Sequence, residues 1–465
     1  MRRRVVIVGG GMAGAIVASQ LCDTYFVTVV DLAAANKSLV TKLIDTDYPA
    51  GYWPHAGSGP GGTTSLWQNG LIELEADDYA GWPIDENALD TYVSKAHILL
   101  SGVNRDVVRR ETELLRNRYT SLGIPQPLLG NAVFYPRDRR NVWRTLDLAH
   151  RPVEFVVGRA LYFESDHAGH AHAVIVRQGD SEKRVEGDVF VAACGGLSTP
   201  ILMHETAKRG GQSWKDVAGR FYHDHPIVFV GETRVGAKLY DLWNFSAPEL
   251  GGTIRLPFVV REEGLKFAFY LRPTFKLWRQ KSRIKLRSIL VQLRNSPYNL
   301  ENYWNLLKNS DDIIDILSFR FGWNVPTSEY SILVVAEQPP DQERAVRWSE
   351  ADNAILRSWR MSGTYLATME RAISSFAESL SSMVEDLRIF PEWQHDFISG
   401  AHHSGTCRMA SHSGAGVCDS DAKAFELENL FVCDGSLIPS GGFANTGLTI
   451  GALALRLADH IRDRF

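Results

Sequence analysis

The sequence contains few cysteines, and their spacing suits neither a metal site nor a disulfide framework. The cysteines are scattered and odd in number, and no pair has C-x-x-C spacing. A structural zinc site needs closely spaced cysteines or histidines, and a disulfide-stapled domain needs paired cysteines. We therefore expect no metal site and a reducing compartment, which favours a cytoplasmic location. The five residues are Cys22, Cys194, Cys407, Cys418 and Cys433.

Neither charge nor hydrophobic length points to nucleic acid or to a bilayer-spanning segment. The 465 residues carry a net charge of -4, with 45% hydrophobic and 22% charged residues. Because there is no basic excess, nucleic-acid binding is not expected, and no uninterrupted apolar run is long enough to cross a bilayer. The arginines at positions 2–4 imitate a signal peptide, but the glycine spacing that follows argues against one. The length suggests two lobes, and small-molecule chemistry is the favoured class.

The N-terminus has the pattern of a dinucleotide-binding unit. An apolar run at 5–8 precedes G-x-G-x-x-G at 9–14, an Ala-rich helical segment at 15–21, and a second apolar run at 26–30 that ends in an acid. The first glycine permits a tight turn, the second lets the backbone approach a pyrophosphate, and the third lets the helix pack on the strand. The acid has the spacing that bonds an adenosine ribose. The predicted cofactor-binding residues here are Gly9, Gly11, Met12, Ala13, Gly14 and Asp31.

Three segments near the C-terminus are interpreted as one catalytic site. They read A-H-H-S-G-T-C-R-M at 401–409, N-L-F-V-C-D-G-S at 429–436 and N-T-G-L-T-I at 445–450. A polar loop with a histidine, a short apolar strand that ends in Asp-Gly, and an asparagine before the helical run 448–461 would gather polar groups near a helix N-terminus. Such a terminus favours negative charge.

These segments resemble the C-terminal signature of the glucose-methanol-choline (GMC) flavin oxidoreductases. The shared pattern is H-x-x-G-T-x-x-M, then N-L-F/Y-V-x-D-G-S, then N-x-x-L-T-I-x-A-L-A-x-R-x-A. The resemblance places His402 at the catalytic base position and Asn445 at the second position, where the family has His or Asn. His403 stands where the family usually has Pro.

Two further motifs resemble the same family and imply FAD. G-G-T-T-S-L-W at 61–67 and D-Y-A-G-W-P-I at 78–84 look most like the pyranose-oxidase and sugar-dehydrogenase branch. In several members a histidine of the first motif bonds covalently to FAD. Leu66 occupies that position here, so non-covalent FAD is predicted.

Two middle segments extend the resemblance. V-F-V-A-A-C-G-G at 189–196 is similar to the returning strand of the FAD domain, and D-V-A-G-R-F-Y-H-D-H-P at 216–226 is similar to a segment whose histidines we interpret as structural. The further cofactor contacts that the resemblance implies are Gly62, Thr63, Trp67, Ala193, Gly195, Asp434, Gly435 and Thr446.

The implied fold is α/β, with a Rossmann-like FAD-binding domain interleaved with an α+β substrate-binding domain, a sheet backed by helices. We assign residues 1–75, 150–229 and 396–465 to the FAD-binding domain. Residues 76–149 and 230–395 form the substrate-binding domain and connecting segments. Strands are expected at 266–271 and 331–335, hairpin strands at 153–163 and 171–177, and a helix at 89–100.

A basic amphipathic stretch occupies residues 276–294. Its cations, with no acid among them, are Lys276, Arg279, Lys281, Arg283, Lys285, Arg287 and Arg294. We interpret it as the solvated face of a helix in the substrate-binding domain. Peripheral contact with a membrane or a partner, and recognition of an anionic substrate, stay open.

The resemblance implies an FAD-dependent oxidoreductase that converts C-OH to C=O on a sugar, glycoside, polyol or related metabolite. Hydride would pass to flavin N5, His402 would act as general base, and Asn445 would hold the substrate oxygen. Oxygen or another acceptor would then take the electrons. Three alternatives stay open: a lyase or photodecarboxylase on the same fold, a flavin-binding partner protein without turnover, and an NAD-dependent dehydrogenase, which the motifs after residue 60 disfavour.

Overall fold

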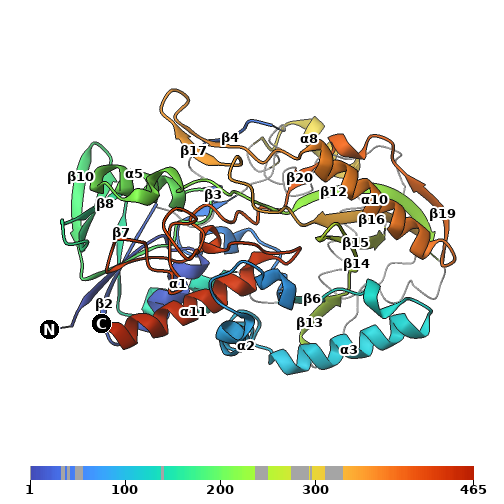
Figure 1. The fold of residues 1–465 in the computed structure, drawn as a ribbon, viewed down its shortest axis with the longest axis horizontal. Coiled ribbons are helices and arrows are strands. Elements are labelled where there is room, and N and C mark those ends of the chain that lie inside the picture. Colours follow the sequence, from blue (N-terminus) through green and yellow to red (C-terminus); the bar gives the residue numbers. More distant parts are fainter. Residues whose placement is uncertain are drawn as a thin grey trace.

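The computed structural model describes residues 2–32, 37–38, 42–47, 56–137, 141–235, 250–273, 293, 296–308 and 328–465. Two sheets dominate the chain, one parallel and one antiparallel, and Figure 1 shows them at opposite ends of an elongated molecule. Both termini lie at the end that holds the parallel sheet. The predicted α/β architecture, with the two domains interleaved along the sequence, is confirmed.

The parallel sheet has the strand order β21-β11-β1-β2-β7. Its strands are β1 (Arg4–Val8), β2 (Phe26–Asp31), β7 (Val153–Val157), β11 (Val189–Ala192) and β21 (Leu430–Val432). β1, β11 and β21 are apolar almost throughout, as expected for strands covered on both faces. Helix α1 (Met12–Leu21) packs against α11 (Thr446–Arg464), which also contacts α2 (Glu86–Ser101).

The hairpin predicted over residues 153–163 is only partly correct. β7 joins the parallel sheet beside β2, and the chain passes Gly158 before β8 (Arg159–Ser165) begins. β8 pairs with β9 (Ala171–Gln178), and β9 with β10 (Ser181–Glu186), in a separate antiparallel sheet. Alternating apolar residues identify a strand but not its partner, because pairing depends on the rest of the chain.

The antiparallel sheet has the order β14-β15-β16-β12-β19, with β20 paired to β12. It includes both strands predicted at 266–271 and 331–335, and helix α10 lies over it (Figure 1). Phe376 of this helix stacks on Phe269 of β15 with ring centroids 4.1 Å apart. The strand β12 crosses the predicted domain boundary at residue 229. The elements are β12 (Pro226–Val235), β14 (Phe258–Glu262), β15 (Leu265–Pro273), β16 (Glu329–Ala336), β19 (Val384–Ile389), β20 (Ile398–Ser399) and α10 (Gly363–Leu380).

Further helices and strands lie outside the two main sheets. They are β3 (Lys37–Ser38), β4 (Lys42–Asp45), β5 (Gly57–Ser58), α3 (Arg105–Ser121), β6 (Val133–Pro136), α4 (Val142–Thr145), α5 (Thr199–Gly210), β13 (Gly252–Arg255), α8 (Leu300–Lys308), β17 (Val346–Ser349) and β18 (Ala354–Arg357). The predicted helix at 89–100 lies within α2. Across the described residues, we find no helix with the length and apolar character that a bilayer span requires.

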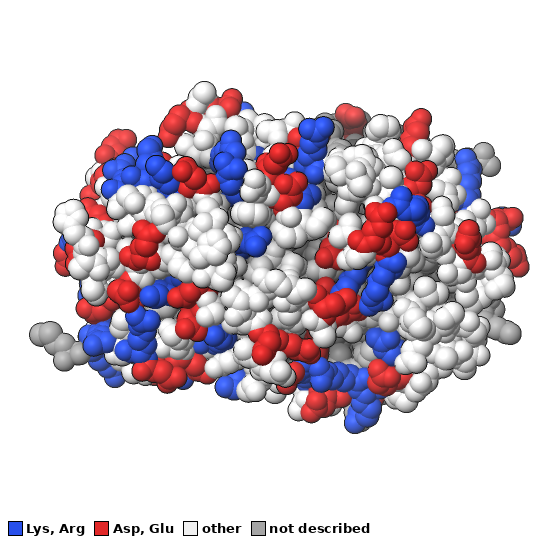
Figure 2. Space-filling model, in the orientation of Figure 1, with Lys and Arg blue, Asp and Glu red and all other residues white. Residues whose placement is uncertain are grey.

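The surface carries acids and bases side by side. Figure 2 shows Lys and Arg interspersed with Asp and Glu over the face in view. Apart from Leu293, the predicted basic helix at 276–294 lies outside the described residues.

Candidate active site

The first glycine loop follows β1 and packs so closely that side chains are excluded. Gly9 has φ 109°, and a Cβ there would lie 2.3 Å from the carbonyl oxygen of Ala193. A Cβ on Gly14 would lie 1.9 Å from the carbonyl oxygen of Gly9. Among the described residues, a Cβ on Gly11 would meet only the Ala193 oxygen within 4 Å, at 4.0 Å. The loop is therefore tight against the protein on one side and open at Gly11.

The second glycine loop lies directly against the first. The Gly61 N–H donates to the carbonyl of Gly10 at 2.7 Å, and a Cβ on Gly62 would lie 2.9 Å from Cα of Gly11. The Thr63 hydroxyl accepts from the backbone of Gly57 at 3.2 Å. Two glycine motifs that lie far apart in the sequence thus form one surface.

Trp67 connects this surface to the last helix. A Cβ on Gly447 would lie 2.6 Å from the Trp67 ring and 3.6 Å from Cε of Met12. Thr446 is the first residue of α11, so the predicted contacts Met12, Trp67 and Thr446 lie close together.

Asp31 holds the two glycine loops through its carboxylate. One oxygen accepts from Gly10 N at 2.6 Å, and the other accepts from Leu32 N at 2.5 Å and Gly59 N at 3.3 Å. Burial raises the pKa of Asp31, while these backbone hydrogen bonds oppose the rise. Three of roughly four acceptor positions are thus used within the protein, which leaves about one for a ribose hydroxyl.

Asp434 ties the ends of β11 and β21 together. Its carboxylate accepts from Gly195 N at 2.8 Å, from the Thr199 hydroxyl at 2.5 Å and from Ser436 N at 2.8 Å. Burial raises its pKa, and these hydrogen bonds lower it. The Asp434 side chain therefore positions the loop that contains Gly195.

These features fit a bound dinucleotide. The N-terminus of α1, where Met12 and Ala13 begin the helix, has no side-chain cap and no acid in its first turn. Exposed amide groups at such a terminus bind phosphate. Gly11, Gly195 and Trp67 are half-buried, so they border space that solvent reaches. The chain can hold FAD between the glycine loops, the Gly195 loop and the start of α11.

His402 lies beside this surface, in the loop after β20. Its backbone N–H donates to Asp224 at 2.9 Å, and its Nδ1 lies 2.8 Å from Nδ1 of His225. The two rings are 4.9 Å apart at 65°. A Cβ on Gly435 would lie 2.5 Å from the carbonyl oxygen of His403, so the loop also rests on the Asp-Gly turn.

The contact between His225 and His402 was not predicted. We interpreted the histidines of residues 216–226 as structural, but this one touches the predicted base. The two residues lie 177 positions apart, and the pairing of β12 with β20, together with a backbone bridge between His223 and Ser404, brings them together. The adjacent Asp-His-Pro sequence was the available signal.

A buried polar network supports the two histidines. The second oxygen of Asp224 accepts from the hydroxyls of Ser399 and Tyr222, and Arg357 lies 3.8 Å away. Burial alone would raise the pKa of Asp224, but His403, Arg357, His402 and the Ser399 hydroxyl hold it well below its usual range.

Arg357 and His403 complete this network. Arg357 makes two bonds to Asp45, at 2.5 and 2.7 Å, and both side chains are almost fully buried. Nδ1 of His403 lies 2.8 Å from the Tyr222 hydroxyl. The residue that replaces the usual proline therefore belongs to the supporting network.

Asn445 is the N-cap residue of α11 and is half-buried. Its amide donates a long hydrogen bond of 3.4 Å to the carbonyl of Gly70. The loop that leads to it includes Gly442, which contacts the ring of His225. The loop before Asn445 thus contacts His225, the residue whose ring touches His402.

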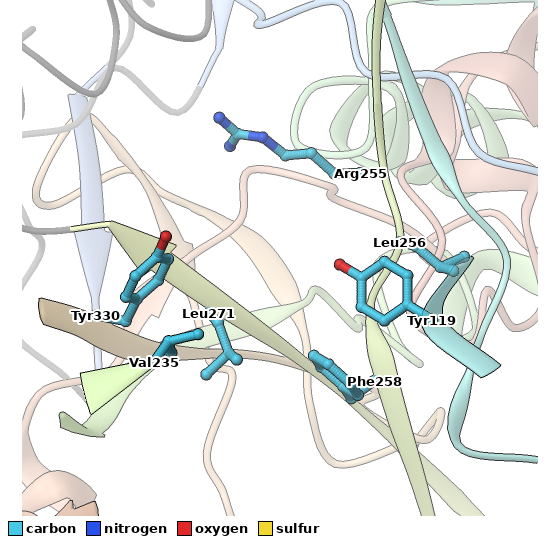
Figure 3. A pocket seen from close by; sticks show the side chains of 7 residues that line it. All are labelled: Tyr119, Val235, Arg255, Leu256, Phe258, Leu271 and Tyr330. Atoms are coloured by element: carbon cyan, nitrogen blue, oxygen red, sulfur yellow. The ribbon is translucent and has the colours of Figure 1, made fainter. Parts of the chain in front are cut away.

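A small cavity lies apart from these residues, in the antiparallel sheet. Its volume is about 20 Å³, enough for about one water molecule. Figure 3 shows Tyr119 and Tyr330 on opposite sides of it, with Arg255 nearby. None of the predicted site residues lines this cavity, and it is too small for an organic substrate.

Comparison with known proteins finds a family match in the C-terminal part of the chain. Residues 331–454 match the GMC oxidoreductase family. The chain is 44% identical to 2-methyl-1,2-propanediol dehydrogenase from Mycolicibacterium austroafricanum over 66 residues. This match covers 14% of this chain and 12% of that protein. The chain is 40% identical to the long-chain-alcohol oxidase FAO4B from Arabidopsis thaliana over 124 residues. That match covers 26% of this chain and 16% of the relative.

The fold extends the similarity over the whole chain. The structure of pyridoxine 4-oxidase from Mesorbium loti superposes with a TM-score of 0.65 and covers 100% of both chains at 15% identity. The sequence matches span 12% and 16% of the lengths of the two curated relatives. These names do not single out the predicted pyranose-oxidase and sugar-dehydrogenase branch.

Proposed function

We infer, from the match of residues 331–454 to the GMC oxidoreductase family, that this chain is an FAD-dependent enzyme that oxidises an alcohol group to a carbonyl. Glycine loops, a free helix N-terminus and a histidine beside them are the parts that such a reaction requires. The observation that carries the proposal is the continuous set of contacts from the Gly9–Gly14 loop to His402.

The residues proposed to hold FAD are the cofactor-binding residues predicted from the glycine loops and the C-terminal motifs. They are Gly9, Gly11, Met12, Ala13, Gly14, Asp31, Gly62, Thr63, Trp67, Ala193, Gly195, Asp434, Gly435 and Thr446. When bound, FAD supplies a hydride acceptor at N5. The N-terminus of α11 would favour the negative charge that reduction brings. Because Leu66 cannot form a covalent flavin link, we propose that the cofactor is non-covalent.

His402 is proposed as the general base. Its imidazole removes the proton of the substrate hydroxyl as the hydride leaves the carbon that bears this hydroxyl. Asn445 would hold the substrate oxygen through its side-chain amide, which makes a long hydrogen bond to Gly70. The buried carboxylate of Asp224 holds the backbone of His402 in place.

The proposed substrate is a sugar, glycoside, polyol or related metabolite. This choice rests on the Trp67 and Trp82-Pro83 motifs, which resemble the sugar-oxidising branch. The two relatives above are named for a diol and for long-chain alcohols, and these substrates belong in the same assay. Oxygen or another acceptor would reoxidise the flavin. We propose a cytoplasmic location. Peripheral contact with a membrane or a partner through residues 276–294 is a further possibility of the same proposal.

The experiment is to compare flavin reduction in the wild type and in His402→Ala. Removal of a general base should slow reduction by about 10²–10⁴-fold at saturating alcohol. His412→Ala, which removes an exposed histidine ten positions along the same chain segment, is the control and should reduce at the wild-type rate. A rate within about twofold of wild type for His402→Ala would reject it as the base.

A further inference from the structure

The rings of His225 and His402 meet through like nitrogens. Their Nδ1 atoms lie 2.8 Å apart, and His225 is 3% exposed. Two unprotonated nitrogens at that distance would present lone pairs to each other, so one ring must donate and the other accept. The direction of this bond decides which nitrogen of His402 has the lone pair.

The other side of the His225 ring determines that direction. His225 makes a hydrogen bond to the backbone of Gly442, and its Nε2 faces the same loop, 4.0 Å from the position of a Cβ on Gly441. That bond raises the pKa of His225, so the ring nitrogen is the donor and the peptide carbonyl the acceptor. A neutral imidazole has one donor and one acceptor. Nδ1 of His225 is therefore the acceptor.

The ring of His225 stays neutral. Burial, with smaller effects of His402 and His223 in the same direction, lowers its pKa to about 3 against the opposing effects of Asp224 and the Gly442 bond. The titratable groups around the pair are Asp224, His223, His403, Tyr222 and Arg357. Of these, burial lowers the pKa of His223 to about 4, so this ring is neutral too.

We propose that His225 is a positioning residue that fixes the tautomer of His402. It accepts the proton on Nδ1 of His402 and so leaves the lone pair on Nε2, where a substrate hydroxyl can deliver its proton. This inference rests on the proposed function, in which His402 is the base. The His225 ring also supports the positive charge that His402 acquires when it accepts the proton.

The backbone around the pair is built to hold this contact. One oxygen of Asp224 accepts from the N–H groups of both His225 and His402, at 2.7 and 2.9 Å. Gly400 passes beside the pair, where a Cβ would lie 3.0 Å from Nδ1 of His402 and 2.9 Å from the carbonyl oxygen of His225. A single carboxylate and a glycine thus hold the two histidine rings in contact.

The first test reads the tautomer directly. Histidine is labelled with ¹⁵N in the holoenzyme, the signals of His402 are assigned by their loss in His402→Ala, and long-range ¹H–¹⁵N correlations report which nitrogen is protonated. The proposal predicts a proton on Nδ1 and a lone pair on Nε2. The opposite tautomer would overturn it, and this measurement decides even if a variant of His225 does not fold.

The second test separates an acceptor from a merely structural ring. His225→Leu removes the acceptor, whereas His225→Asn keeps an oxygen near the position of Nδ1. We expect flavin reduction by the leucine variant to fall by about 10-fold to 100-fold, part of what a base contributes. The apparent pKa of its pH profile should fall by about one unit, because the protonated base loses a hydrogen bond. The asparagine variant should restore most of the rate and the profile.

The matched control is His223→Leu, which removes a buried histidine of the same segment. Its ring bonds the carbonyl of Phe221 instead of His402. Its pH profile should match the wild type. A leucine variant of His225 with the wild-type rate and profile would overturn the proposal. If no alcohol reduced the wild-type flavin, the proposed function would fail, while the tautomer measurement would still report on His225.

Discussion

Removing the buried cation Arg357 should destabilise the protein strongly. Its side chain is 0% exposed. It donates to the carboxylate of Asp45, which is 1% exposed, at 2.5 and 2.7 Å. It also lies 3.8 Å from the carboxylate of Asp224, which is 0% exposed. Arg357→Met preserves much of the length of the side chain and removes the charge. Two buried carboxylates then lose their compensating charge, and breaking a buried pair in this way costs about 3–5 kcal/mol of unfolding free energy.

The cost should depend on pH in a defined direction. In the wild type the pKa of Asp224 is held below its usual range, so its stabilisation is present above the unfolded pKa and is lost only at strongly acidic pH. Without Arg357, the folded pKa of Asp224 should be higher than in the wild type, because burial then acts against fewer opposing charges. Protonation of this carboxylate then relieves the unpaired charge. The loss of unfolding free energy in Arg357→Met should therefore be smaller at pH 5 than at pH 8.

Urea unfolding followed by circular dichroism at both pH values measures this effect. The control is Arg371→Met, which breaks pairs with Glu262 and Glu263 at a site where the arginine is 46% exposed. Surface pairs contribute about 0–1 kcal/mol, so this variant should stay close to wild type. A deficit below about 1 kcal/mol for Arg357→Met, or one that does not change with pH, would refute the reasoning.

Two further predictions concern the cofactor. Gly14→Ala should lower the unfolding free energy by about 1–3 kcal/mol and reduce flavin content, because its Cβ would lie 1.9 Å from the oxygen of Gly9. Gly363→Ala, where a Cβ would meet no atom of the described residues within 4 Å, should change neither. Equal flavin content in both variants would contradict the packing argument. Acid precipitation should release the yellow chromophore into the supernatant, because Leu66 cannot link to flavin; chromophore retained in the pellet would show a covalent bond.

The dinucleotide-binding unit could be predicted because its signals are local. The glycine spacing and the two apolar runs occupy the first 31 residues, and the strands and helix lie where these patterns indicated, with the helix starting earlier, at Met12. The strands within Leu265–Pro273 and Glu329–Ala336 were found for the same reason. Periodicity within one segment is enough to identify such an element.

The supporting network could not be predicted because it joins distant segments. Asp45 and Arg357 are 312 positions apart, and parallel pairing of β4 with β18 brings them together. Likewise, β7 reads as a hairpin strand but pairs with β2, since alternation does not specify a partner. The role of His225 depends on the same kind of long-range pairing, so sequence patterns gave only its position beside an acid and a proline.

The most direct test of the central claim is anaerobic mixing of the purified flavoprotein with sugars, glycosides, polyols, a vicinal diol and simple alcohols. Absorbance of the oxidised flavin is followed after each addition, and air is then admitted to test oxygen as the acceptor. The account predicts that at least one alcohol class bleaches the flavin in the wild type. A flavin that dithionite reduces but that no alcohol bleaches would contradict alcohol oxidation.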